Sequence, residues 1–413
     1  MVKETLDGER RVALAPEGVQ KLTGLGYDVG VEPNAGAAAD FSDQDYEGAG
    51  AAMDGDRLED ADVVVSVQPL RIEQIRKLRE GAATMSFLPI GQNLDLVRDL
   101  RDCGVTAFAL ELVPRVSRAQ SMDALSSQAL VAGYRGGIVA AGMLRRFFPL
   151  AMTSAGRINP AQVVVLGAGV AGLQAIATAR RLGAVVKAYD VREASAEEIR
   201  SMGAEAIDLE LETLEGSGGY AREMTEDRAN KQRAALTPYV AAADALITTA
   251  AVPGRPAPML VTSAMVEQMS PGAVVVDLAA EQGGNVEGSS PGETVRIGHA
   301  LVWGGVNVPS QMPGPASRLL STNIANLITL MTADPDEDEQ PEPAGHSEQP
   351  ETGPESESAD ESQEGQVDEP DEEDAQSARF APDFDDEVIA GCCVVHRGEV
   401  RHAPTRELLE EDS

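Results

Sequence analysis

The chain has 413 residues, which allows two or three domains, and 43% of them are hydrophobic, enough for buried cores. Acidic residues outnumber basic ones 68 to 33, and the net charge of −35 argues against nucleic acid or an anionic membrane surface as the main partner. Only 5 of the 33 cations are Lys, a skew that together with the acidity favours a halophilic protein, adapted to high salt.

The ends and the cysteines bear on location. Residues 1–10 are polar and lack the apolar core of a signal peptide, and no run of about 18 uncharged apolar residues predicts a membrane span. Cys103 and the adjacent Cys392 and Cys393 fit neither a disulfide framework nor the paired spacing of a zinc site. We therefore expect a cytoplasmic protein without a metal site or a membrane span of its own.

Short apolar runs alternate with helical stretches along the first part of the chain. Strands are predicted at 29–31, 63–67 and 84–87, and a helix at 16–24. A long apolar helix near 129–149, interrupted by arginines, is predicted to connect this part to the next.

The alternation sharpens after residue 162. Buried strands are predicted at 163–166, 185–189, 245–249 and 273–277, with helix-length segments between them. Strands that alternate with helices in this way predict βαβ units and a parallel sheet.

A glycine turn follows the strand 163–166. Gly167, Gly169 and Gly172 open directly into a helical run, and the next strand ends at Asp190, 18 residues beyond the last glycine. The first glycine allows the tight turn, the second lets the backbone approach a pyrophosphate, and the third permits close packing of helix on strand. The helix N-terminus then offers unpaired N–H groups to the phosphates. The alternative is a purely structural turn. The predicted binding residues are Gly167, Gly169, Val170, Ala171, Gly172, Asp190, Val191 and Arg192.

The residues after the second strand bear on the choice of dinucleotide. Asp190 would accept hydrogen bonds from the adenosine ribose and repel a 2′-phosphate, which favours NAD(H). Arg192 weakens this argument, because a nearby arginine can bind a 2′-phosphate.

An acidic segment interrupts the chain at 334–379. It holds 19 Asp or Glu against one Arg, lacks large apolar residues, and is rich in Pro, Ser, Gln and Gly. Such a composition predicts a disordered linker, because too little apolar surface is available to offset the ordering entropy. Beyond it, residues 387–390, 393–395 and 397–400 suggest short strands of a terminal hairpin that returns to the body.

These elements predict an α/β fold made of two Rossmann-like domains with parallel sheets. The first would be discontinuous, formed by 1–133, 309–333 and 380–413, and the second would be the NAD-binding Rossmann domain at 134–308. The cofactor is expected in the cleft between them, at the carboxyl ends of the strands.

A polar segment at 114–128 precedes the long helix. It carries two Arg, two Gln, one Asp and four hydroxyls, with too few apolar positions for a helical stripe. One interpretation is a capped entry to the helix, with Ser or Asp as the N-cap. The other is a ligand-binding loop, in which Arg and Asp fix each other while Gln and Ser bind an amide and a ribose.

The residues of this loop resemble those of a known family. Arg115 to Gln128, followed by Ala132-Gly133-Tyr134-Arg135, are similar to the signature loop of the NAD(H)-binding component, domain I or the alpha subunit of the alpha-1 type, of proton-translocating NAD(P) transhydrogenases. The resemblance spans nearly all of 2–333 and 385–401 and includes Glu9 to Pro16, the glycine turn with Asp190, Gly218 to Ala221, Thr248 to Pro258, and Val275 to Asn285.

The resemblance implies roles for individual residues. Arg115, Gln120, Asp123 and Ser126 would act at the nicotinamide end, and Tyr220 would belong to a mobile loop that closes over the cofactor. Arg115 and Ser126 would hold the carboxamide, Gln120 would reach toward the second nucleotide, and Asp123 would orient Arg115. Further residues implied at the cofactor are Val116, Ser117, Arg118, Gly219, Gln232 and Ala251.

The resemblance also implies the reaction and the partners. Hydride would pass directly between NADH bound here and NADP⁺ bound on an NADP(H)-binding (beta) partner subunit, coupled to proton translocation by a membrane subunit. The chain would be a homodimer and would lie at the cytoplasmic face of the membrane through these partners. Since hydride transfer between two nicotinamides needs no general acid or base, catalysis is expected to depend on positioning and on exclusion of water.

Two alternatives remain. Alanine dehydrogenase shares the architecture and the Arg11 region, but its substrate-binding Lys and catalytic His are absent here, where the matching stretches read Val67-Gln68-Pro69-Leu70 and Ser86-Phe87-Leu88-Pro89-Ile90. A non-catalytic NAD-binding regulatory module would not need the polar loop.

Overall fold

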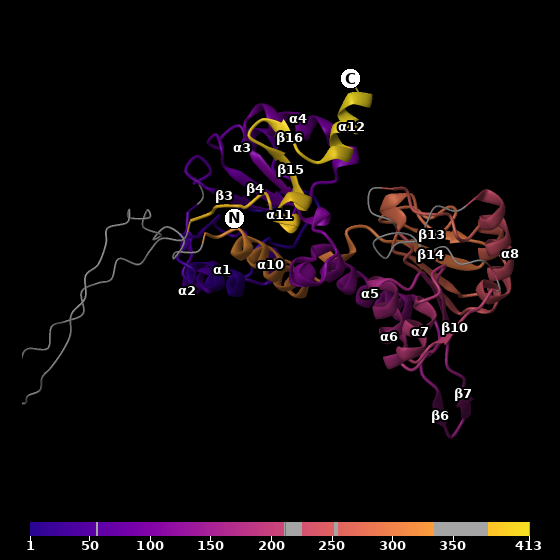
Figure 1. Ribbon diagram of the computed structural model, residues 1–413. Helices are drawn as coiled ribbons and strands as arrows, with labels where there is room; N and C mark the ends of the chain where they lie inside the picture. Colours follow the sequence, from indigo (N-terminus) through magenta and orange to yellow (C-terminus); the bar gives the residue numbers. More distant parts are fainter. Residues whose placement is uncertain (55–56, 210, 212–224, 252–254, 334–378, 413) are drawn as a thin grey trace, which may run out of the picture.

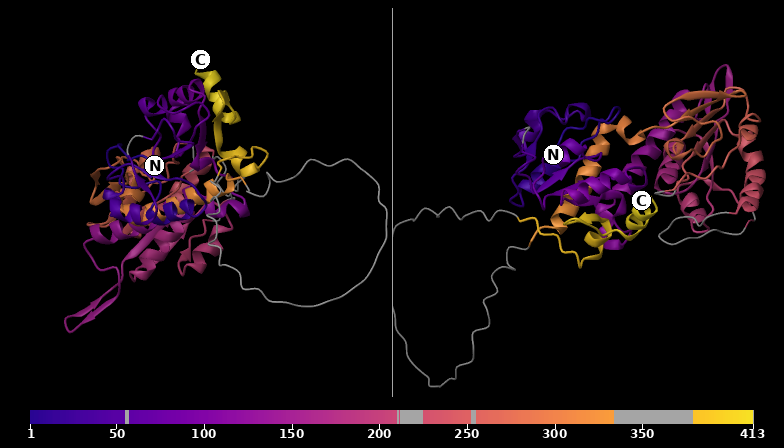
Figure 2. Two further views of the ribbon diagram at one scale, coloured as in Figure 1. Left: turned by 90° about the vertical axis from the view of Figure 1, so that its left-hand side faces the viewer. Right: turned by 90° about the horizontal axis from the view of Figure 1, so that it is seen from above.

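Two bodies of secondary structure make up the computed structural model (Figure 1). The structure describes residues 1–412 except 55–56, 210, 212–224, 252–254 and 334–378. We call the elements around a five-stranded sheet the first domain and those around a seven-stranded sheet the second domain. Two stretches of chain join them, the long helix α5 (Ala124–Met143) and the segment that follows residue 304 (Figure 2).

The first domain combines the beginning and the end of the chain. Its early elements are α1 (Pro16–Thr23), β1 (Gly30–Val31), α2 (Asp43–Gly48), β2 (Ala52–Met53), β3 (Val63–Val65), α3 (Ile72–Ile75), β4 (Ala83–Ser86), α4 (Leu94–Asp102), β5 (Thr106–Ala109) and the 3₁₀ helices η1 (Ala37–Ala39), η2 (Ile90–Gln92), η3 (Leu110–Leu112) and η4 (Ser117–Met122). Its late elements are α10 (Pro313–Leu330), α11 (Glu387–Cys392), β15 (Cys393–His396), β16 (Glu399–Val400) and α12 (Ala403–Glu411).

The sheet of the first domain has the order β16-β15-β5-β4-β3 among the described residues. Strands β3, β4 and β5 are parallel and almost fully buried, as expected for strands with helices on their faces. Strand β15 joins them antiparallel, with Cys393 opposite Phe108. Helix α10 packs on α1 and on η4, so residues after 312 complete this domain.

The second domain is a doubly wound sheet. Its elements are β6 (Ala151–Thr153), β7 (Gly156–Ile158), β8 (Gln162–Leu166), α6 (Val170–Arg181), β9 (Val185–Tyr189), α7 (Ser195–Ser201), β10 (Glu205–Ala206), α8 (Glu226–Ala242), β11 (Ala245–Thr248), α9 (Ser263–Val266), β12 (Val274–Asp277), β13 (Thr294–Ile297), β14 (Ala300–Gly304) and the 3₁₀ helices η6 (Ala280–Gln282) and η7 (Val308–Gln311).

The strand order of this sheet is β10-β9-β8-β11-β12-β14-β13 in the described chain, with β13 antiparallel and the others parallel. The order reverses between β8 and β11. In open α/β sheets, ligands bind beyond the carboxyl ends of the strands at such a reversal. The glycine turn follows β8 and therefore lies at this point.

The predicted α/β class, with two Rossmann-like domains, is confirmed. All seven strands predicted before residue 300 form within a few residues of their expected bounds. The domain bounds of 1–133 with 309–333 and 380–413, and of 134–308, stay a prediction, and the predicted linker at 334–379 lies almost entirely outside the described residues.

One expected strand is a helix. Residues 387–390 were expected to be extended, but they belong to α11, because the Asp386 carboxylate accepts hydrogen bonds from the backbone N–H groups of Val388 and Ile389 and caps the helix. The hairpin itself is confirmed one step later, by β15 and β16.

The ends of the acidic segment meet on the first domain. Thr332 and Phe380 form an antiparallel bridge, and the Ala333 N–H donates to the Arg379 carbonyl at 3.0 Å. The chain therefore leaves and re-enters the domain at one place. Among the described residues, no helix is both long and apolar enough to cross a bilayer.

Candidate nucleotide-binding site

The glycine turn after β8 has the local geometry that its sequence predicts. Gly167 has a φ of +98°, in the region that favours glycine. A Cβ on Gly172 would lie 1.9 Å from the Gly167 carbonyl oxygen, so the start of α6 approaches the turn closely. A Cβ on Gly169 would meet nothing within 4 Å. The second glycine thus faces open space beside the helix N-terminus, as a site for a pyrophosphate requires.

A neighbouring loop supports this turn from the other side of the strand-order reversal. The Thr249 hydroxyl, just after β11, donates to the Gly167 carbonyl at 3.2 Å. The Asn285 side chain accepts a hydrogen bond from the Ala250 N–H and donates to the Ala250 and Pro258 carbonyls. Asn285 is fully buried, and it fixes the backbone beside the predicted cofactor residue Ala251. The sequence pointed to Asn285 only through the resemblance.

Asp190 at the end of β9 is already engaged. Its carboxylate accepts the Ala168 N–H at 2.7 Å, which ties the glycine turn to the neighbouring strand. Arg192 grips the same carboxylate with Nε at 2.8 Å and Nη2 at 3.0 Å. The side chain of Asp190 is 9% exposed. Both predicted residues therefore lie at the expected position, with their charges paired.

Gln232 on α8 is buried and accepts a hydrogen bond from the Tyr189 hydroxyl at 3.1 Å. It thereby ties α8 to the strand that carries Asp190. Gly219 and Tyr220, predicted for the mobile loop, lie outside the described residues. Residues 252–254, after Ala251, are likewise not described.

The polar loop begins the helix that joins the domains. Asp123 is the N-cap of α5, and its carboxylate accepts hydrogen bonds from the Ser126 N–H at 2.9 Å and the Ser126 hydroxyl at 2.6 Å. Arg115 and Gln120 are exposed. Both interpretations of the loop therefore apply to the same residues, since the cap fixes Ser126 next to two exposed polar side chains.

Helix α5 connects this loop rigidly to the glycine turn. A Cβ on Gly133 would lie 2.1 Å from the Ala171 carbonyl, and one on Gly137 would lie 2.9 Å from the Thr178 side chain, so α5 and α6 are in backbone contact. At 1.5 Å per residue, Asp123 lies about 15 Å along the helix from Gly133. One helix thus sets the spacing between the two predicted halves of the site.

The remaining loop residues are held from the first domain. Arg118 pairs with Asp386 and Glu387. The Ser121 carbonyl accepts from the side-chain amides of Asn323 at 2.8 Å and Asn326 at 3.0 Å, both on α10. Val116 is the residue before η4, and Ser117 begins it.

A buried ion pair lies where the carboxyl ends of β3 and β4 meet the junction of the domains. Glu9 and Arg11 are paired at 2.7 Å, and the side chains of Arg11 and Glu9 are 6% and 0% exposed. Burial tends to raise the pKa of Glu9, but the Arg11 guanidinium outweighs it and holds that pKa at about 2. Arg11 also donates to Gln128 at 2.9 Å and to Asn307 at 3.2 Å.

The two positions compared with alanine dehydrogenase surround this pair. Gln68 follows β3 and donates to Glu9 at 2.8 Å, and the ring of Phe87 lies 5.9 Å from the Arg11 guanidinium carbon. A 2-amino acid carboxylate would need a cation here, yet Arg11 is neutralised by Glu9. The sequence gives no sign of this network, because its members are up to 298 residues apart.

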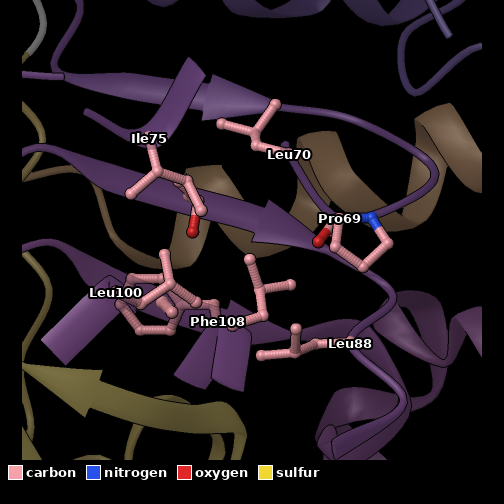
Figure 3. Close-up of a pocket in the computed structure, with 10 residues that line it drawn as sticks. Pro69, Leu70, Ile75, Leu88, Leu100 and Phe108 are labelled. Atoms are coloured by element: carbon pink, nitrogen blue, oxygen red, sulfur yellow. The ribbon is translucent and has the colours of Figure 1, made fainter. Parts of the chain in front are cut away.

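Two cavities are formed by other parts of the first domain. A void of about 10 Å³ lies among the side chains of β4, β5 and α4, with Leu70, Ile75 and Phe108 in its lining (Figure 3). It has room for about one water. An open surface hollow of about 310 Å³ lies between α4 and α12. Neither is lined by the glycine turn or by the polar loop.

The fold and the turn define the protein as a two-domain α/β protein with a Rossmann dinucleotide site. The space at Gly169, the closeness of Gly172 to the turn and the carboxylate at Asp190 fit a dinucleotide.

Comparison with known proteins gives the family. Residues 1–132 match the family "Alanine dehydrogenase/PNT, N-terminal domain" and residues 137–341 match "Alanine dehydrogenase/PNT, C-terminal domain", so the chain belongs to the alanine dehydrogenase/PNT family.

Individual relatives point to one branch. An NAD(P) transhydrogenase alpha subunit of Rhodospirillum rubrum, the first of the segments into which that subunit is divided, is 46% identical over 338 residues, which cover 79% of this chain and 88% of that protein. The alanine dehydrogenase of Mycobacterium tuberculosis is 32% identical and covers 80% of this chain and 86% of its own length. A transhydrogenase crystal structure from Sinorhizobium meliloti superposes with a TM-score of 0.77 at 35% identity, covering 98% of this chain and all of that one.

Proposed function

We propose that the chain is the NAD(H)-binding alpha subunit of an NAD(P)⁺ transhydrogenase. The observation that carries the proposal is the joining of two sites by α5, in which the dinucleotide turn with Asp190 is held at a fixed spacing from the Asp123-Ser126 cap and its exposed Arg115 and Gln120. The similarity to transhydrogenase alpha subunits along most of the chain supports it.

The bound nucleotide supplies the chemistry, a hydride that leaves C4 of the dihydronicotinamide of NADH and forms a bond to C4 of NADP⁺ on a partner subunit. No proton is released in this exchange, so none of this chain's residues has to titrate. Arg115 and Ser126 orient the carboxamide, with Ser126 fixed by Asp123. Gln120 reaches the junction with the second nucleotide, and Tyr220 closes the site against water.

Asp190 gives the preference for NAD(H). Its carboxylate is oriented by the Ala168 N–H and lies where the adenosine ribose hydroxyls bind. The Arg192 pair neutralises part of its charge, so the carboxylate acts mainly as a hydrogen-bond acceptor.

The two alternatives have less support. Alanine dehydrogenase chemistry needs a free cation and a base at the carboxyl ends of β3 and β4, where Gln68, Phe87 and the closed Glu9–Arg11 pair lie. A regulatory NAD-binding module would leave the polar loop, with its cap and its exposed arginine, without a task.

The remaining assignments concern assembly. The partners are an NADP(H)-binding beta subunit and a proton-translocating membrane subunit, and the chain lies on the cytoplasmic face of the membrane through them. We also propose a homodimer. The hairpin of β6 and β7 projects from the second domain (Figures 1 and 2), and its Met152 is 71% exposed. A two-stranded hairpin with exposed apolar side chains gains stability from a partner surface.

The test is reconstitution with the purified NADP(H)-binding subunit. The wild-type chain should bind NADH more tightly than NADPH and should support hydride transfer only in the mixture. Replacing Gln120 by Asn should slow transfer at least about tenfold, because the ring geometry is disturbed, and should leave the Kd for NADH nearly unchanged. Equal losses in both would contradict a positioning role. Turnover of alanine or pyruvate by the chain alone would contradict the proposal itself.

A further inference from the structure

The conformation of the polar loop depends on a segment far away in the chain. Arg118, in the middle of η4, donates from Nη1 and Nη2 to the two carboxylate oxygens of Asp386, at 2.6 and 2.9 Å. Its Nε lies 3.3 Å from a carboxylate oxygen of Glu387. The bond to Asp386 is a bidentate pair, the geometry in which an arginine is held in one orientation.

Asp386 is itself fixed before it meets Arg118. One carboxylate oxygen accepts the N–H groups of Val388 and Ile389 at 2.7 and 3.3 Å, and its side chain is only 19% exposed. Helix α11 is anchored in turn, since Val388 and Ile389 are buried in the core of the first domain. The acceptor is therefore rigid, unlike that of an ordinary surface ion pair.

A second contact brings the same helix onto the loop. A Cβ on Gly391 in α11 would lie 2.5 Å from the Pro114 ring, so the helix and the start of the loop are in close contact. The loop is thus held by α11 at Pro114 and Arg118 and by α10 at the Ser121 carbonyl. Arg115 and Gln120 lie between these fixed points.

We propose that Asp386 is a positioning residue of the nucleotide site, which acts through Arg118 to hold residues 115–122 in the conformation that aims Arg115 and Gln120 at the nicotinamide. The inference rests on the proposed function of the loop and extends it to the segment that follows the acidic insertion. Arg118 then serves the site through Asp386 and not through a contact of its own with the cofactor.

The test compares Asp386→Asn with Glu387→Gln. Asparagine keeps an oxygen for the helix cap but removes the second charged acceptor of Arg118. Glu387 is 63% exposed and makes only the longer contact, so Glu387→Gln is the matched control. Both variants are measured in the full chain for the Kd of NADH and of AMP, for hydrogen exchange of the amides of 117–122, and for kcat and KM with the NADP(H)-binding partner.

The expected result for Asp386→Asn is a fall in kcat of about tenfold and a rise of a few fold in the Kd for NADH, because the ring loses its alignment. Amides 117–122 should exchange faster, while the Kd for AMP, which occupies only the adenosine end, should stay unchanged. Arg118→Lys should reproduce this pattern, since lysine cannot make the bidentate bond, and adding it to Asp386→Asn should cause little further loss.

Three results would overturn the inference. They are wild-type kcat and wild-type exchange in Asp386→Asn, equal losses in Asp386→Asn and Glu387→Gln, or a parallel loss of AMP binding, which would indicate general unfolding. If the wild-type mixture transfers no hydride, the proposed function fails, and the exchange rates and the comparison of NADH with AMP still decide the role of Asp386.

Discussion

Gly169 and Gly172 lie three residues apart in the same turn but have opposite surroundings. Gly172→Ala brings a methyl group against the Gly167 carbonyl, so we expect a shifted turn, a lower melting temperature and a Kd for NADH raised by about a hundredfold or more. Gly169→Ala meets open space in the protein alone. It should leave the melting temperature unchanged and still weaken NADH, because the methyl group fills the place of the pyrophosphate.

Thermal melting and NADH titration of the two variants separate these effects. The chain's single tryptophan, Trp303 at the end of β14, gives a fluorescence signal for both measurements. If Gly169→Ala binds NADH as tightly as the wild type, the dinucleotide does not pass over this glycine, and the assignment of the turn is wrong.

Two buried glutamates near the domain junction should respond to pH in opposite directions. Burial raises the pKa of Glu4 to about 7, although the N–H groups of Val67 and Gln68 partly offset it. Since the folded chain then binds a proton that the unfolded chain has lost, stability from Glu4 falls as pH rises from about 4.5 to 7. The pKa of Glu9 is depressed to about 2, so its contribution is present above about 4.5 and is lost as pH falls toward 2.

Glu4→Gln isolates the first effect. The free energy of unfolding, measured in urea, should change with pH differently in the two proteins between pH 5 and 7.5. Relative to the variant, the wild type should lose on the order of 3 kcal/mol over this range. Parallel pH profiles would mean that Glu4 titrates normally.

At the level of elements, local patterns predicted what local patterns determine. The strand, glycine turn and helix at 162–181 are one continuous motif, and their geometry follows from the sequence alone. Helix α11 was mistaken for a strand because Val388 and Ile389 form an apolar pair in either structure, and only the Asp386 cap decides between them. The strands β5 and β14 were missed as well, since short apolar runs beside helices carry little periodicity.

The candidate site was predictable only in its contiguous parts. Asp190 and the Asp123-Ser126 cap stand next to the motifs that mark them. The supports come from elsewhere, such as the Asn307 side chain on Glu9 and the Asp386 carboxylate on Arg118, 268 residues away. No spacing rule connects residues that meet only through tertiary packing, so a single sequence gives no signal for them.

The paired ends of the acidic segment make its removal testable. Replacing 335–377 by a short Gly-Ser turn keeps the Thr332–Phe380 bridge and the Ala333–Arg379 hydrogen bond. The Kd for NADH should stay the same, and the shorter loop should stabilise the fold by about 2 kcal/mol through its lower closure entropy. Urea unfolding and NADH titration measure both.

A point substitution in the shortened chain provides the control. Phe384 stacks on Phe108 with ring centroids 6.4 Å apart and on His396 at 4.2 Å, so Phe384→Ala should lose about 2 kcal/mol. A large loss of NADH affinity on shortening alone would show that the segment contributes to the site.

For the molecule as a whole, the exposed hairpin should control assembly. Met152→Asp places a charge on the apolar surface of β6, so the proposed dimer should dissociate to a monomer at micromolar concentration, with circular dichroism unchanged. Light scattering after size-exclusion chromatography gives the mass. Identical masses for the wild type and the variant would show that Met152 does not lie at a subunit interface.

The antiparallel strand β15 also sets the order in which the protein can be completed on the ribosome. Thr106 of β5 and His396 of β15 bond across 290 residues, whereas the seven strands of the other sheet all lie within 162–304. At roughly 5–20 residues per second, β5 must wait tens of seconds for its neighbour to be translated. During that interval its backbone edge and Phe108 are open to other nascent chains, so the amino-terminal domain, although made first, is the one that depends on chaperones and finishes last.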